Sequence, residues 1–244
     1  SWQRIGTVVM RTRNGLDFEV AGVPTAIADK LEDRGHQGLP QCFTAWEDLY
    51  VAYPQWDTTE SHWVLSLHRL EDGMLPWEVD AFGGPRVILT LAADPYAEVS
   101  VLQFRTDGNT HWVLARDEGM GLPQHDHLGR SLNDGRTWSF HHGENGFEAI
   151  GFVVHDPVGF VLAGARIDDY SLRKGKTSFL YGSDPSDPMV LDPELGTIHS
   201  VRFSPSRLGL SGGILNYVYL PVAEDGTRTQ VFAQRFQVGA GSRP

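Results

Sequence analysis

The chain of 244 residues has little cysteine and no long run of apolar residues. Its single cysteine, Cys42, excludes an internal disulfide, so packing alone holds the fold, in a reducing or an oxidising compartment. The apolar runs are a few residues long, as at Val87, Ile88 and Leu89, whereas a membrane-spanning helix needs about 20. We therefore predict that the chain does not span a membrane.

Positive charge is also scarce, because 20 Lys and Arg residues stand against 31 Asp and Glu residues, for a formal net charge of −11. Proteins that bind DNA or RNA replace the counterions of the phosphates with a basic surface, and the sequence has no tight cluster of Lys and Arg. This excludes nucleic acid as the principal partner. The hydrophobic fraction of 41% predicts a globular chain.

Helical periodicity is confined to residues 25–34, where Ile27 and Leu31 lie one turn apart. Elsewhere 27 Gly and 14 Pro residues separate short segments rich in Val, Ile, Phe, Tyr and Trp. This pattern is typical of strands joined by turns, and it predicts an all-β fold. The predicted strands are residues 41–45, 49–53, 63–68, 99–105, 111–115, 149–154, 160–165, 178–181, 200–203, 217–220 and 230–236.

Four similar tetrapeptides recur along the chain: HWVL at 62–65, HWVL at 111–114, GFVL at 159–162 and YVYL at 217–220. Their spacing is close to the length of a four-stranded propeller blade, which is about 40 to 50 residues. Chance likeness between amphipathic strands is the alternative explanation, since strands reuse few residue types.

Residues 131–138, SLNDGRTW, resemble the Asp-box, the Ser-x-Asp-x-Gly-x-Thr-Trp hairpin of sialidases and other BNR-repeat β-propellers. Asn133 replaces the usual Asp, and its side chain still accepts hydrogen bonds from the turn. Gly135 permits a positive φ, and Trp138 packs beneath the hairpin. A degenerate second copy lies at residues 70–77, LEDGMLPW. The box is structural, so Asn133 and Asp134 are not catalytic candidates.

The resemblance implies a single β-propeller domain over residues 1–244, with five blades, or four as the alternative. The first two blades would use residues 41–45, 49–53, 63–68 and 77–79, then 99–105, 111–115, 128–131 and 137–141. The third would run from 149 to 191 and the fourth from 198 to about 238. An N-terminal strand within residues 2–23 would close the ring with the C-terminal blade, which removes exposed sheet edges.

The resemblance also implies a carbohydrate ligand at the central mouth of the propeller. The loops that enter the inner strands and the loops between the second and third strands of each blade would form this mouth. Glycosidic cleavage by hydrolysis needs two carboxylates across a sugar-sized gap. Glu98 and Glu148 precede or begin predicted inner strands, so they are the predicted catalytic pair of a glycoside hydrolase. The predicted substrate-binding residues at the same mouth are His36, Gln37, Arg116, His125, Tyr170 and Arg202.

Two other functions stay open. A polysaccharide lyase would use His127 and His199 as proton donor and acceptor, with Tyr170, and Arg202 would neutralise a substrate carboxylate. A non-catalytic sugar-binding propeller, a lectin, would repeat similar pockets between blades. The mouth loops here differ from blade to blade, and the sequence QHDH at 124–127 occurs once, which favours a unique site and hence an enzyme.

His125 and His127 are candidate metal ligands, because side chains two residues apart on an extended chain point the same way. They would hold Zn or Ca together with a third ligand such as His36 or His199, and the alternative is a pair of surface histidines. Trp56, Tyr96 and Tyr170 fall in predicted loops and are candidates for stacking on sugar rings. The chain begins at Ser1 rather than Met, which fits a removed signal peptide or upstream domain, and we predict an extracellular or periplasmic location.

Overall fold

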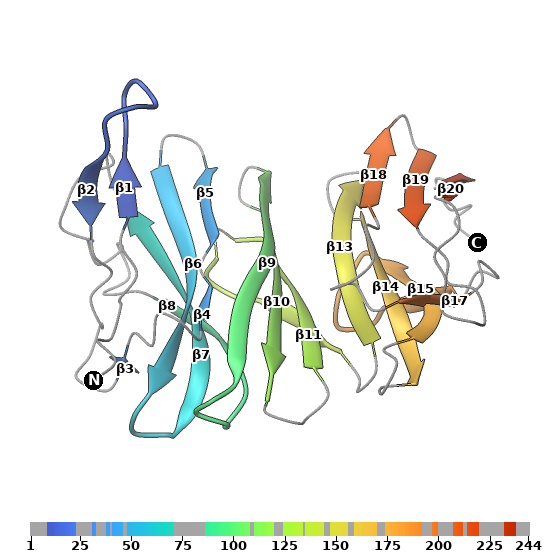
Figure 1. Ribbon diagram of the computed structural model, residues 1–244, viewed down its shortest axis with the longest axis horizontal. Coiled ribbons are helices and arrows are strands. Elements are labelled where there is room, and N and C mark those ends of the chain that lie inside the picture. The colour runs from blue at the N-terminus through green and yellow to red at the C-terminus, as the bar shows by residue number, and fades with distance from the viewer. Residues whose placement is uncertain are drawn as a thin grey trace. The chain divides into compact units, whose positions relative to one another are not determined.

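The computed structural model describes residues 9–22, 31–32, 38–39, 41–45, 48–70, 86–107, 110–119, 124–133, 135–143, 147–155, 159–169, 174–191, 197–199, 207–211, 214–219 and 232–237. Every regular element among them is a strand, which confirms the predicted all-β class (Figure 1). Within these ranges no helix is long and apolar enough to cross a membrane. Of the helix-like segment at 25–34, the two described residues form a strand, β3 (Leu31–Glu32).

The first part of the chain forms a hairpin and a five-stranded sheet. The hairpin pairs β1 (Val9–Arg11) with β2 (Glu19–Gly22). In the sheet, four strands that follow one another along the chain pair antiparallel with their neighbours. They are β5 (Gln41–Ala45), β6 (Asp48–Asp57), β7 (His62–Leu70) and β8 (Arg86–Thr90). β3 pairs with the C-terminal end of the second of these four strands, β6.

The next sheet has the order β12-β11-β10-β9-β4, so four consecutive strands again lie side by side (Figure 1). These are β9 (Glu98–Asp107), β10 (Thr110–Glu118), β11 (Gln124–Ser131) and β12 (Ser139–His142). The short strand β4 (Gly38–Leu39) runs parallel to β9.

Two further sheets complete the described chain, and both are antiparallel. The first follows the order β13 (Phe147–His155), β14 (Gly159–Asp169), β15 (Lys174–Gly182) and β16 (Met189–Leu191), with β17 (Thr197–His199) also paired to β15. The second joins β18 (Arg207–Ser211), β19 (Ile214–Tyr219) and β20 (Phe232–Gln237).

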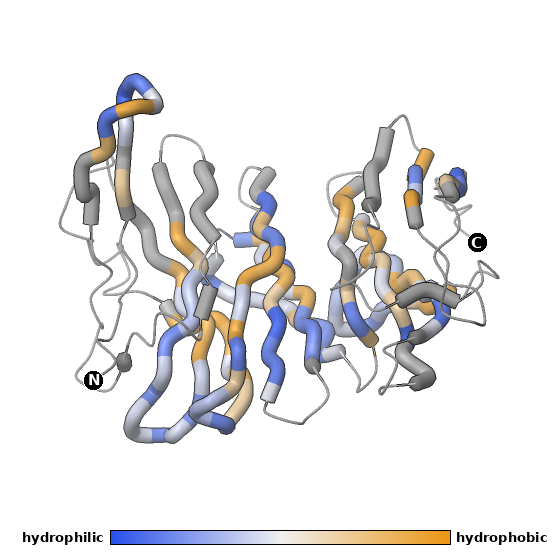
Figure 2. Tube along the Cα trace, viewed as in Figure 1, coloured by the Kyte–Doolittle hydropathy of each residue, from blue (hydrophilic) through white to orange (hydrophobic). Residues whose placement is uncertain are grey.

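The chain divides into two compact units, residues 1–123 with 129–138 and residues 124–128 with 139–244. Within each unit, the first strand of one sheet packs beside the first strand of the next, β5 against β9 and β13 against β18. Hydrophobic residues extend along much of the described strands (Figure 2), and Trp63, Trp112 and Phe160 are fully buried among them. The core therefore lies between successive sheets of each unit.

The tetrapeptide repeat matches the sheets only in part. The copies at 111–114 and 159–162 lie in β10 and β14, the second strands of their sheets, and the described part of the last copy lies in β19. The first copy, at 62–65, begins β7, the third strand of its sheet. The fourth strand of that sheet is β8, whereas the predicted strand at 77–79 lies outside the described residues.

Candidate functional site

Two side chains organise the turn between β11 and β12. The Ser131 hydroxyl donates to Asn133 Oδ1 at 3.1 Å and accepts from the backbone N–H of Gly135 at 2.8 Å. Asn133 Oδ1 also accepts from the backbone N–H of Thr137 at 2.9 Å, and Asn133 Nδ2 donates to the Thr137 hydroxyl. Gly135 has a φ of 72°. Asn133 thus makes the turn hydrogen bonds that the sequence predicts for it.

The indole of Trp138 fastens this turn to the sheet. Its Nε1 donates to the carbonyl of Gly135 at 3.0 Å. The ring meets Phe104 edge-on at a centroid distance of 6.4 Å and lies over His111 at 6.5 Å. These contacts reach β9 and β10, so Trp138 packs the turn against the neighbouring strands of the sheet.

A second turn with the same hydrogen bonds lies between β1 and β2, at residues 12–18, TRNGLDF. The Thr12 hydroxyl accepts from the backbone N–H of Gly15 at 2.9 Å, and Asn14 Oδ1 accepts from that of Asp17 at 2.9 Å. Asn14 Nδ2 donates to Asp17 Oδ2 at 2.7 Å, and Gly15 has a φ of 76°. This turn is one residue shorter than that at 131–138, with the same roles for hydroxyl, amide and glycine.

The sequence did not reveal this second turn as a copy of the turn at 131–138. It has one residue fewer, so its glycine and its aromatic residue do not align with Gly135 and Trp138. The signal was a hydroxyl residue followed two positions later by Asn, then by Gly and an aromatic residue. The copy predicted at 70–77 lies outside the described residues except for Leu70. Phe18 holds the place of the tryptophan and is 56% exposed.

Two carboxylates meet where β9 begins and β10 ends. Glu98 is the first residue of β9, and its direct register partner is Glu118, the last residue of β10. Directly opposite side chains on an antiparallel pair share one face, with Cβ atoms about 4.5 to 5.5 Å apart. Glu98 is exposed and Glu118 is half-buried. The Glu98 side chain is therefore open to solvent, whereas Oε2 of Glu118 is buried.

A guanidinium and an aromatic ring accompany the pair. Arg116 is the register partner of Ser100. This is the next register pair on the face that carries Glu98 and Glu118, and both side chains are buried. Tyr96, two residues before Glu98, is 67% exposed, and its backbone N–H donates to Asp94 Oδ1 at 2.9 Å. The predicted loop position of Tyr96 is confirmed. Trp56 is instead a buried strand residue of β6 that packs edge-on against Trp63.

Glu148 belongs to the other compact unit. It is the second residue of β13, 4% exposed, and its register partner is Ala165. Its neighbour Ala149 donates its backbone N–H to Asp126 Oδ2. The Asp126 carbonyl accepts from the backbone N–H of Gly143 at 2.7 Å, so Asp126 ties three segments together and has a structural role.

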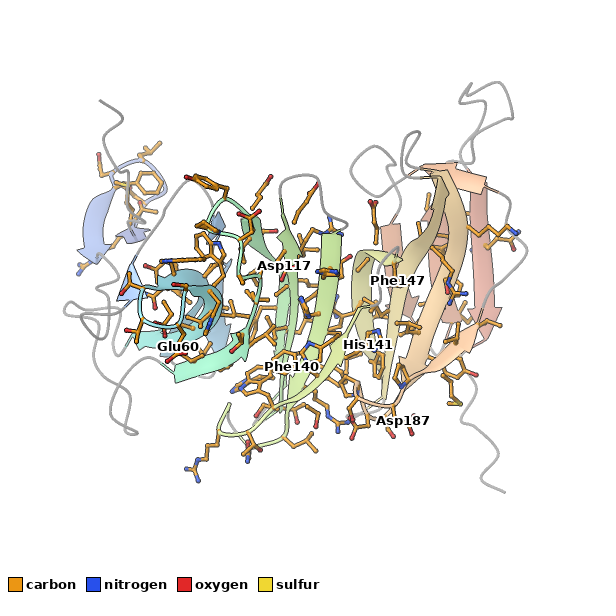
Figure 3. All side chains as sticks on the ribbon, turned by 90° about the horizontal axis from the view of Figure 1, so that it is seen from below. Glu60, Asp117, Phe140, His141, Phe147 and Asp187 are labelled. Atoms are coloured by element: carbon orange, nitrogen blue, oxygen red, sulfur yellow. The ribbon has the colours of Figure 1, made fainter. Side chains whose placement is uncertain are left out.

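His127 is buried and pairs with His142 of β12. Their Nδ1 atoms are 3.1 Å apart, so one imidazole donates its Nδ1–H and the other accepts. The ring of His125 is half-buried, with its centroid 6.5 Å from that of His127. Burial, and then the neighbouring His127, lowers the pKa of His142 below its ordinary value. Figure 3 draws these side chains and labels His141 and Phe140 on the same strand.

The described residues supply no third ligand for the predicted metal site at His125 and His127. No group of three or more His, Cys, Asp and Glu side chains that could hold a metal ion occurs within the described ranges. His36 lies outside them, and His199 is described only as a strand residue opposite Lys174. Zn or Ca at His125 and His127 stays a prediction. The remaining predicted site residues, Gln37, Tyr170 and Arg202, also lie outside the described residues.

Comparison with known proteins adds no family to these observations. No protein-family model matches the chain, and no curated protein is significantly similar to it.

Proposed function

We propose that the chain is a glycoside hydrolase built as a β-propeller, with Glu98 and Glu118 as its two catalytic carboxylates. The observation that carries the proposal is the register of β9 and β10, which sets these two side chains directly opposite each other. Like charges at such positions destabilise a sheet by a fraction of a kcal/mol, so stability alone does not favour this pair.

The register of Glu98 and Glu118 is compatible with a double-displacement mechanism, since directly opposite residues have Cβ atoms about 4.5 to 5.5 Å apart and their carboxyl groups can approach each other closely. Carboxyl groups about 5 to 5.5 Å apart are typical of hydrolases that retain the anomeric configuration, whereas inverting enzymes leave a wider gap for water. One carboxyl group protonates the glycosidic oxygen as its bond to the anomeric carbon breaks, and the other attacks that carbon to form a glycosyl ester. Water then hydrolyses the ester while the first carboxylate takes its proton.

The surroundings of the pair fit a saccharide. Tyr96 is an exposed aromatic ring close in sequence to Glu98, and such rings stack on the apolar faces of sugars. Arg116, on the shared face, supplies a buried positive charge that orients a carboxylate or a sugar hydroxyl. Glu98 was a predicted catalytic residue and Arg116 a predicted binding residue. Glu118 replaces Glu148 as the partner of Glu98 in this proposal.

Four features support the propeller. Consecutive antiparallel strands form successive sheets, and within each unit the first strands of neighbouring sheets pack together. The turn at 131–138 joins the third and fourth strands of its sheet, as the Asp-box does in a propeller, and the turn at 12–18 repeats its hydrogen bonds. We propose five blades, closed by pairing of the N-terminal strands with the C-terminal blade.

The proposal is tested by incubating the chain with neutral and uronate-containing oligosaccharides while reducing ends and ultraviolet absorbance are followed. Hydrolysis releases reducing ends without absorbance, and we expect this result. Glu98→Gln and Glu118→Gln should each lower kcat by a factor of about 100 or more, since general acid–base catalysis contributes that much. Glu60→Gln, an exposed residue of the turn between β6 and β7, is the matched control and should keep full activity.

Other outcomes would overturn the hydrolase. Absorbance that rises with the reducing ends indicates elimination by a lyase. Saccharide binding with neither signal indicates a lectin. Unchanged activity in both Glu variants would remove this carboxylate pair from the mechanism.

A further inference from the structure

Tyr96 is exposed in a tight turn that leads into β9. The backbone N–H of Ala97 donates to the carbonyl of Asp94 at 3.0 Å, which closes the turn over residues 94–97, DPYA. Pro95 holds the second position, where the fixed φ of proline suits a β-turn. Asp94 Oδ1 also accepts from the backbone N–H of Tyr96 at 2.9 Å. Two hydrogen bonds and a proline therefore order the backbone that carries the Tyr96 ring.

Trp63, the second residue of β7, ties this turn to the sheet of β7. Its indole Nε1 donates to the carbonyl of Asp94 at 3.1 Å. Its backbone N–H donates to the carbonyl of Ala92 at 2.8 Å, and its own carbonyl accepts from the backbone N–H of Leu91 at 2.7 Å. Trp63 is fully buried and packs edge-on against Trp56. The turn is thus anchored to the core of the first compact unit.

Burial separates Tyr96 from the residues around it. Leu91 is 8% exposed and Ala97 is fully buried, whereas Tyr96 is 67% exposed. The aromatic ring therefore meets solvent from a backbone that is already ordered. A side chain on an ordered backbone loses less conformational entropy when a ligand binds, and this favours affinity. Tyrosine suits such a role because it offers a large contact area with few rotatable bonds.

The turn lies directly beside the proposed catalytic pair. Glu98 follows Tyr96 by two residues and is also exposed. Two residues of chain span at most about 7 Å between Cα atoms. An oligosaccharide that stacks on Tyr96 is therefore long enough to reach the Glu98 carboxylate.

The charge of the chain favours an uncharged ligand at this turn. The formal net charge is −11, and residues 91–98, LAADPYAE, hold two acidic side chains and no basic one. A surface of one sign lowers the local concentration of ligands of the same sign. Uronates and sulfated sugars are therefore disfavoured, whereas the apolar face of a neutral pyranose stacks on an aromatic ring.

We infer that the turn at 94–97 is a preformed subsite for a neutral pyranose, which stacks on the Tyr96 ring. Asp94 is a positioning residue, because it holds the backbone of Tyr96 rather than the sugar. The inference rests on the proposed function, from which it takes a saccharide as the ligand. It adds the charge class of that saccharide and the residues that orient it.

The test is isothermal titration calorimetry of the full chain carrying Glu118→Gln, so that no probe is cleaved. The probes are cellohexaose, xylohexaose, mannohexaose and, as the charged counterpart, hexagalacturonate. At least one neutral probe should bind, and more tightly than hexagalacturonate. Tyr96→Ala should weaken this binding about two- to tenfold, the loss of one aromatic contact, whereas Tyr96→Phe should keep the affinity. Phe18→Ala removes another exposed aromatic ring and is the matched control, with unchanged affinity.

A double-mutant cycle tests the role of Asp94. Asp94→Asn keeps an oxygen that accepts from the Tyr96 N–H and should keep the affinity, whereas Asp94→Ala removes this acceptor and should weaken binding. In a chain that also carries Tyr96→Ala, Asp94→Ala should have no further effect, because no ring is left to orient. Equal losses in the two backgrounds would overturn the positioning role.

Full affinity in Tyr96→Ala, no binding of any neutral probe, or tighter binding of hexagalacturonate would overturn the subsite. These results are distinguishable from failure of the proposed function. Binding that depends on Tyr96, in a parent chain that releases no reducing ends, would contradict the hydrolase and support the subsite. Hydrolysis with the same KM in the parent chain and in Tyr96→Ala would contradict the subsite and leave the hydrolase standing.

Discussion

The surroundings of the His142 imidazole favour its neutral form by lowering its pKa. Partial burial lowers its pKa first, and the nearby His127 lowers it further. Their Nδ1 atoms are 3.1 Å apart, close enough for one hydrogen bond between neutral rings. Protonation of both rings would place two positive charges at that distance and remove the acceptor. The hydrogen bond between His127 and His142 joins β11 to β12.

We predict that His142 makes folding stability fall as the pH is lowered. The pKa of His142 is lowered in the folded state, so the unfolded chain binds the proton more readily. The stabilisation is complete above the unfolded pKa, which is about 6.5, and is lost as the pH falls toward the lowered folded pKa. Urea unfolding at several pH values between about 8 and 5 measures this loss.

The comparison is made with His142→Gln, which keeps a polar side chain and cannot take up the proton. Its free energy of unfolding should fall less steeply over the same pH range, while His141→Gln should follow the parent chain. Parallel curves for the parent and His142→Gln would contradict the assigned role of this imidazole.

Individual residues could be predicted where a local motif determines them. Asn133 and Gly135 have the roles expected from eight consecutive residues. Glu98 was predicted as a catalytic residue from its place before a predicted strand, whereas its register partner Glu118 was not singled out. Glu118 follows Glu98 by 20 positions, and the register between β9 and β10, with its irregularity at Leu114 and Ala115, decides which acid it faces. No periodicity in the sequence specifies that register.

At the scale of elements, the two asparagine turns show how one hydrogen-bond pattern tolerates different neighbours. In the longer turn Asn133 Nδ2 donates to the Thr137 hydroxyl. In the shorter turn Asn14 Nδ2 donates to the Asp17 carboxylate. A hydroxyl also donates, whereas an ionised carboxylate only accepts. The same Asn→Asp change therefore has opposite consequences in the two turns.

We predict that Asn133→Asp is tolerated, because the Thr137 hydroxyl reverses its bond and donates to the new carboxylate. Asn14→Asp sets two carboxylates together and should lower the free energy of unfolding by about 1 kcal/mol, the repulsion of two charges about 4 Å apart in water. Urea unfolding of both variants, beside Asn133→Ala and Asn14→Ala, measures the difference. A loss in Asn133→Asp as large as that in Asn133→Ala would show that the hydroxyl does not reverse.

Strand content could be predicted from composition, but strand order could not be predicted everywhere. The predicted strand at 41–45 agrees with β5, because turn residues and apolar alternation mark it. The strand β8, which begins at Arg86, was not predicted, although Gly83, Gly84 and Pro85 directly before it are a turn signal. Likewise, HWVL occurs in a second strand and in a third strand, because both bury alternate residues.

At the scale of the whole molecule, a closed propeller makes a prediction about size. A compact chain of 244 residues has a radius of gyration of about 18 Å. Small-angle X-ray scattering should give this value, with a single cooperative unfolding transition. A clearly larger radius with two separate transitions would contradict one closed ring. Far-ultraviolet circular dichroism should show strand without appreciable helix.

The stereochemistry of hydrolysis tests the paired carboxylates most directly. Proton NMR of the first product formed from an anomerically pure oligosaccharide shows whether the new reducing end keeps the configuration of the cleaved bond. Glu98 and Glu118 are direct register partners, so their carboxyl groups can lie within the short gap typical of retaining enzymes, and we predict retention. An inverted first product, or retention that persists in Glu98→Gln and Glu118→Gln at the parent rate, would contradict the account.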